Sequence, residues 1–149
     1  MRQLFKVVAI LTVLLTMNQT LWAETTVLFQ FTINPTKDNG KNWDYWASTA
    51  APDVYGSVKM ITGETCEIEL KKNTNIVSHY CFFSTPLKKG DQFSIALSDK
   101  DAMRSDVIFT GSVTYQDNPT IIEQTDIEAN ELTNSGLRKI EIKVIAKKR

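Results

Sequence analysis

Hydrophobic and polar residues alternate with a period of two along most of the chain after residue 26. Five segments alternate regularly over five to seven positions: Val27–Ile33, Val54–Met60, Cys66–Leu70, Phe93–Leu97 and Ile140–Val144. Such alternation is typical of β-strands with one buried face. Tyr80–Phe83 and Val107–Tyr115 are predicted as two further strands, one short and one less regular. The pattern therefore predicts seven or eight short strands.

Turn-forming residues separate these segments. They are Asn34-Pro35, Asp38–Gly40, Thr62-Gly63, Lys88–Asp91, Asp117–Pro119 and Asn134–Gly136. Short strands joined by such turns predict one antiparallel β-sandwich or β-barrel. Between residues 121 and 132 the pattern leaves open one helical turn or an irregular crossover.

The N-terminus has the features of an export signal. Two basic residues, Arg2 and Lys6, precede an uncharged apolar run over 7–15, and Ala23 precedes Glu24. These features predict a signal peptide over 1–23; the alternative, a membrane anchor, would need about 20 apolar residues. Cleavage would leave 126 of the 149 residues as one domain over 24–149 and change the net charge from zero to −2. We expect a periplasmic or secreted protein with no transmembrane segment after cleavage.

The near-zero charge does not favour nucleic-acid binding. The only two cysteines, Cys66 and Cys81, are predicted to form a disulfide, because an even count in an exported chain indicates pairing. Closing a loop of about 15 residues would contribute about 3 kcal/mol. Two buried thiols are the alternative. A catalytic dithiol or a zinc site that includes His79 is less favoured by the spacing.

Aspartates gather where predicted strands end or begin. Asp99 and Asp101 follow one strand, Asp106 begins the next, and Asp44 and Asp53 flank the loop before another. Carboxylates two positions apart in extended chain point the same way, and converging carboxylates are the ligands that calcium prefers. The alternative is that these aspartates cap turns with their own side chains.

Aromatic residues surround one of these aspartates. Trp43, Tyr45 and Trp46 flank Asp44, and Met103 lies in the other acidic loop. Amphipathic rings on loops suit a membrane interface or a protein or sugar partner, so we expect these four residues to contact one. The alternative for Trp43 is that it closes the end of the core.

Residues 53–58 and 97–101, followed by Asp106 and Gly111, resemble the C-two domain family of calcium- and phospholipid-binding β-sandwiches. The turn over 88–91 and the closing strand over 137–145 also fit this family. The resemblance implies a sandwich of eight strands. It also implies that Asp44 and Asp53 are first-loop calcium ligands and that Asp99, Asp101 and Asp106 are third-loop ligands. The segment from Asp44 to Asp53 is longer than the family's usual first loop.

These features favour a non-enzymatic binding module. Calcium held by the aspartates would complete a surface for an anionic partner, such as phospholipid or lipopolysaccharide headgroups, or for a protein. The alternative is a metal-free structural or interaction protein of the periplasm or of a secretion or surface assembly. A small hydrolase is a third class, but no Gly-x-Ser-x-Gly motif or phosphate-binding loop is present.

Overall fold

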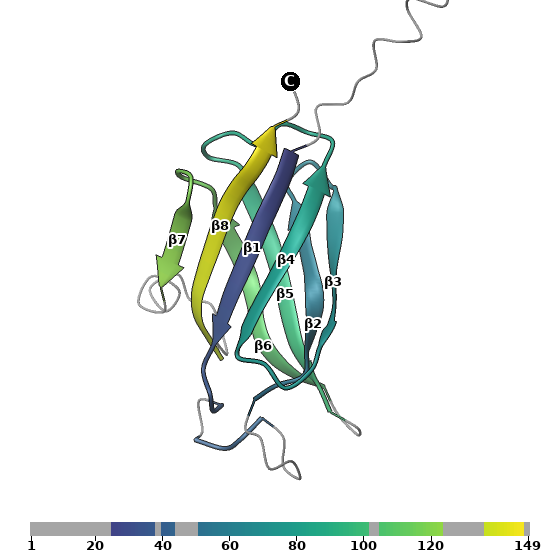
Figure 1. The fold of residues 1–149 in the computed structure, drawn as a ribbon, viewed down its shortest axis with the longest axis vertical. Helices are drawn as coiled ribbons and strands as arrows, with labels where there is room; N and C mark the ends of the chain where they lie inside the picture. Colours follow the sequence, from purple (N-terminus) through teal and green to yellow (C-terminus); the bar gives the residue numbers. More distant parts are fainter. Residues whose placement is uncertain (1–24, 38–39, 44–50, 102–104, 124–135, 148–149) are drawn as a thin grey trace, which may run out of the picture.

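The computed structural model describes residues 25–37, 40–43, 51–101, 105–123 and 136–147. These residues form eight strands: β1 (Thr25–Ile33), β2 (Val54–Met60), β3 (Thr65–Lys71), β4 (Ile76–Phe83), β5 (Gln92–Lys100), β6 (Ser105–Thr114), β7 (Thr120–Glu123) and β8 (Leu137–Lys147). They build two four-stranded antiparallel sheets, ordered β4-β1-β8-β7 and β3-β2-β5-β6 (Figure 1). The predicted antiparallel sandwich is confirmed. The expected signal peptide over 1–23 lies outside the described residues.

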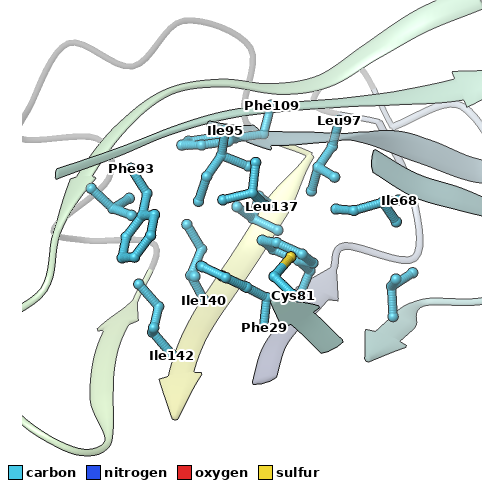
Figure 2. Packing of buried hydrophobic residues seen from close by; sticks show 14 of the residues in the cluster. Phe29, Ile68, Cys81, Phe93, Ile95, Leu97, Phe109, Leu137, Ile140 and Ile142 are labelled. Atoms are coloured by element: carbon cyan, nitrogen blue, oxygen red, sulfur yellow. The ribbon is translucent and has the colours of Figure 1, made fainter. Parts of the chain in front are cut away.

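The period-two pattern places one face of each strand in the core. Phe29 of β1 and Phe93 of β5 meet between the two sheets, with ring centroids 5.1 Å apart and planes at 85°. Figure 2 shows Ile140 of the first sheet and Ile95 of the second pointing into the same layer. Edge-to-face aromatic packing and aliphatic burial of this kind hold the sheets together.

Strand β7 was not predicted. It covers Thr120–Glu123 and so overlaps the start of the segment 121–132, for which the sequence indicates a helical turn or an irregular crossover. Its four residues are too few for alternation to show, and Ile121 is exposed although it is apolar. The strand owes its conformation to pairing with β8, which is a tertiary contact.

Gly56 lets β2 approach β5 closely. A Cβ atom at this position would lie 2.0 Å from the carbonyl oxygen of Ala96, so the backbones could not keep this spacing with any other residue. The glycine lies beside an irregularity in the β2–β3 register, between Val54 and Gly56. The close approach therefore fixes β2 against the strand that carries Asp99.

The predicted disulfide between Cys66 and Cys81 is confirmed. It joins β3 to β4, with Cα atoms 5.7 Å apart. These two strands are edge strands of different sheets and do not pair with each other. The bond therefore covalently closes one open side of the sandwich.

Glu64 adds a second connection between the sheets near the disulfide. Its carboxylate accepts hydrogen bonds from the backbone N–H of Ser84 (2.7 Å) and of Thr85 (3.0 Å) and from the Thr85 hydroxyl (2.6 Å). The Thr85 hydroxyl bond, helped by the two backbone bonds, lowers the pKa of Glu64 even though burial opposes the shift. The charged form of Glu64 thus ties the β2–β3 turn to the segment after β4.

We predict that Glu64→Gln lowers the free energy of unfolding by about 1 kcal/mol at pH 7, less than the roughly 1.5–3 kcal/mol of bonds to a buried charged group, because the carboxylate is partly solvated. A lowered folded-state pKa stabilises the fold above the ordinary value of 4.5, and this contribution is lost as the pH falls through the lowered pKa. Urea unfolding of both proteins across pH 3–7 should show the difference shrinking toward acid. Glu67→Gln removes the same charge from the exposed face of β3 and serves as the control. A difference that stays constant with pH would contradict this role.

Candidate functional site

Three of the predicted ligands come together because of strand register. Asp99 of β5 pairs with Val54 of β2 on one side and with Asp106 of β6 on the other. Asp53 immediately precedes Val54. Residues directly opposite each other in antiparallel strands share a face, with Cβ atoms about 5 Å apart, and this places Asp99 beside Asp106. Asp53 lies one position before the residue opposite Asp99 and contacts Asp99 through its backbone N–H. We call the end of the sandwich at which Asp53, Asp99 and Asp106 all lie the acidic end; in Figure 1 it is the lower end.

Asp99 lies within β5, whereas the sequence placed it just beyond the strand. It continues the inward-facing series of Phe93, Ile95 and Leu97 and has no solvent exposure. Its Oδ1 atom accepts a hydrogen bond from the backbone N–H of Asp53 at 2.7 Å. A buried carboxylate is costly unless it is hydrogen-bonded, so this contact offsets part of the cost of its position.

Asp53 connects three segments at the acidic end. Its carboxylate accepts the backbone N–H of Asn73 at 2.8 Å, and its carbonyl accepts the N–H of Lys100 at 2.9 Å. Asn73, in the β3–β4 connection, has a φ of 49°, a conformation that asparagine tolerates better than most residues. Asp53 and Asp99 therefore accept hydrogen bonds from backbone groups that are distant in the sequence, rather than capping their own turns.

Lys37 contacts Asp106, a pairing that the sequence pattern does not predict. The Lys37 ammonium forms an ion pair with Oδ2 of Asp106, and the two side chains are 22% and 33% exposed. The same ammonium lies 5.6 Å from the centre of the Trp43 ring. Lys37 lies 69 positions before Asp106, so no local pattern indicated the contact. The signal available was a lysine in the loop after a strand that ends near the aspartates.

Trp43 is a core residue, which corrects the expectation that it contacts a partner. It is 2% exposed, and its Nε1–H donates to the carbonyl of Asn34 at 2.8 Å. Its ring lies against Gly136, where a Cβ atom would come within 2.3 Å of it. A side chain buried to this extent cannot reach a partner while the end of the core stays closed. The structure therefore supports the alternative role of Trp43, closing the end of the core.

The other candidate residues divide into two groups. Asp101 is described and is half-buried. Asp44, Tyr45, Trp46 and Met103 lie outside the described residues, so their predicted roles stay predictions.

The buried Oδ1 of Asn75, which follows the segment bound by Asp53, has no hydrogen-bond partner among the described residues. An amide oxygen can ligate the same hard cations as carboxylate oxygens do.

The acidic end does not hold a preformed metal site in the part of the chain that the structure describes. There, the only group of three metal-ligating side chains with all ligand atoms within 4.8 Å of one another is Cys66, His79 and Cys81. Asp53, Asp99 and Asp106 instead engage two backbone N–H groups and one ammonium. To bind one cation together, these carboxylates would have to move, and Asp106 would have to release Lys37.

Comparison with known protein families and with curated proteins finds no match for this chain. Among the described residues, none belongs to a helix with the length and hydropathy needed to cross a membrane.

We predict that Asp99→Ala lowers the free energy of unfolding by about 1–3 kcal/mol more than Asp99→Asn does. Asparagine keeps an oxygen that can accept the Asp53 N–H, whereas alanine leaves that donor without its acceptor. Urea unfolding in the presence of a chelator measures both losses. Equal losses for the two variants would show that the bond from Asp53 to Asp99 does not organise this end.

Proposed function

We propose that this protein is an exported, non-enzymatic binding module that uses its acidic end to bind calcium and an anionic partner. The observation that carries the proposal is the register of β2, β5 and β6, which gathers Asp53, Asp99 and Asp106 from separate parts of the sequence. The export signal and the resemblance to the C-two family support the proposal from the sequence. The arrangement in two four-stranded antiparallel sheets agrees with the architecture that this resemblance implies.

The donor set suits a hard cation. All the candidate ligands offer carboxylate oxygens, and an ionised carboxylate has about four lone-pair positions on its two oxygens. Asp53 and Asp99 each accept a backbone N–H in the hydrogen bonds described above, and a carboxylate can accept several contacts at once. Asp101, two positions beyond Asp99, would join them, and Asp44 is a fifth candidate. Calcium would supply positive charge and coordination positions for the phosphate oxygens of a partner.

For calcium to bind Asp106, it must replace the ammonium of Lys37. This ammonium is paired with Asp106, so calcium can use this carboxylate only when Lys37 moves away. Released from Asp106, Lys37 would lie beside the metal and could meet an anionic group. Phospholipid or lipopolysaccharide headgroups are the proposed partners. Both carry phosphate oxygens that could coordinate calcium, and both are found on membrane surfaces that an exported protein can reach.

A second candidate function is favoured by the same ion pair. If Lys37 permanently supplies the positive charge for Asp106, the acidic end is complete without metal. The protein would then be a metal-free structural or interaction protein of the periplasm or of a surface assembly. The loop with Tyr45 and Trp46 would remain its predicted contact region.

We predict that calcium raises the thermal unfolding temperature of the protein, and that the Asp99→Asn/Asp101→Asn variant loses this rise. At about 100 times the dissociation constant, binding to the folded state adds about 2.7 kcal/mol. Scans in chelator and in millimolar calcium measure the effect, and sedimentation with anionic and with neutral vesicles tests the partner.

The matched control is Asp117→Asn. It removes an exposed carboxylate at the opposite end of β6, where Asp117 lies 3.9 Å from Lys89. The control should keep the calcium response of the wild-type protein. No shift in several millimolar calcium would refute the metal and leave the metal-free function.

We predict that Lys37→Met binds calcium about three- to tenfold more tightly than the wild type. Asp106 then has no ammonium for the metal to displace, and a partly exposed ion pair is worth about 1 kcal/mol. Isothermal titration measures the dissociation constants. Lys59→Met, which removes an exposed lysine near the other end of β2, should match the wild type. Weaker binding by Lys37→Met than by the wild type would contradict the replacement of Lys37 by calcium.

A further inference from the structure

The clearest cluster of metal-ligating side chains lies away from the acidic end, around the disulfide. Cys66, Cys81 and His79 have their ligand atoms within 4.8 Å of one another. The cysteines come from β3 and β4, and His79 precedes Cys81 by two positions on β4. Positions two apart on a strand share a face, so His79 and Cys81 both point inward.

The fold does not require a histidine at position 79. Along the inner face of β4 His79 stands between Val77 and Cys81, which are buried, and it pairs in register with Phe29 of β1. An apolar side chain would satisfy the alternation equally well. It is the only histidine of the chain, and it lies beside the only two cysteines.

We propose that reduction of the Cys66–Cys81 bond converts this place into a binding site for a zinc-class metal ion. Both thiolates and the imidazole of His79 would be its ligands. Two thiolates and one histidine are a recognised donor set for zinc, with a fourth position open to water or another ligand. This inference is independent of the function proposed for the acidic end.

The redox step is balanced with a dithiol as the reductant. The dithiol passes two electrons and two protons to the bond; the S–S bond breaks, two cysteine thiols form, and the reductant becomes a disulfide. Metal binding then releases the two thiol protons to solvent, because the thiolate is the ligand. The disulfide form of the same reductant can reverse the exchange: it takes two electrons from the thiolates and two protons from solvent, the Cys66–Cys81 bond forms again and the metal is released. The same residues would therefore hold either the disulfide or the ion.

The local architecture permits this change. Tetrahedral zinc with bonds of about 2.0–2.3 Å separates its ligand atoms by about 3.5–3.8 Å, so the sulfurs must move apart while the histidine stays close. Strands β3 and β4 belong to different sheets and share no ladder hydrogen bonds. They can therefore separate slightly without breaking a ladder. Cys66 and His79 are half-buried, which leaves a route from solvent.

The test uses the purified protein without a polyhistidine tag, reduced with a phosphine under anaerobic conditions and titrated with cobalt(II). We expect one equivalent to bind with thiolate-to-cobalt charge-transfer absorption, a signal that carboxylate binding at the acidic end cannot produce. Zinc should displace the cobalt. The oxidised protein should show no such absorption, since both sulfurs are then bonded to each other.

Variants separate a site from chance proximity. The Cys66→Ser/Cys81→Ser variant should abolish the charge-transfer band, because no thiolate remains, and His79→Gln should weaken binding more than tenfold. Ser78→Ala, on the outer face of the same strand, should bind as the wild type does. Three results would overturn the proposal: no saturable binding by the reduced protein, equal affinity for His79→Gln, or a reduced chain whose β-sheet circular dichroism is lost and is not restored by the metal.

Discussion

The acidic end depends on the central position of Asp99 in its sheet. Strand β5 pairs with β2 on one side and with β6 on the other, and Asp99 is the last inward-facing residue before these pairings end. Its buried carboxylate must find hydrogen-bond donors, and the backbone N–H of Asp53 supplies one. Asp53 in turn holds the β3–β4 connection through Asn73. One buried carboxyl group thus orders the start of β2 and, through it, the neighbouring connection.

Most of the fold could be predicted from the sequence because alternation is a local pattern, and the apolar residues of each alternating segment are those that the core buries. The inward series of Phe93, Ile95 and Leu97 is visible in the sequence and is buried in the structure. Strand β7 was missed because its conformation comes from pairing with β8. Asp99 was placed outside its strand because charged residues are common at strand ends, whereas in the structure it is buried within β5 and accepts a hydrogen bond from Asp53.

The site was predicted less completely than the fold, since its geometry depends on contacts between distant residues. Aspartates at strand ends were recognised, and the register brings three of them together. The ion pair of Lys37 with Asp106 and the burial of Trp43 depend on how the loop after β1 packs at the end of the sandwich. Neither has a signature in local spacing. Lys37 alters the chemistry most, because a cation must compete with an ammonium already in place.

The two clusters of potential ligands have different chemistry and lie in different parts of the sandwich. Carboxylate oxygens gather at one end, whereas sulfur and imidazole nitrogen gather along the side that the disulfide closes. The first suits hard cations and the second suits borderline ones. Each can be altered by substitution without touching the other, so the two can be studied separately.

The most direct test of the acidic end as the calcium site is a calcium titration of the ¹⁵N-labelled protein followed by nuclear magnetic resonance. The backbone amide of Asp53 bonds to Asp99, and the amides of Asn73 and Lys100 bond to Asp53. If the acidic end binds calcium, these three amide resonances shift together and saturate at one equivalent of bound calcium. Unchanged resonances for all three in millimolar calcium would contradict calcium binding at this end.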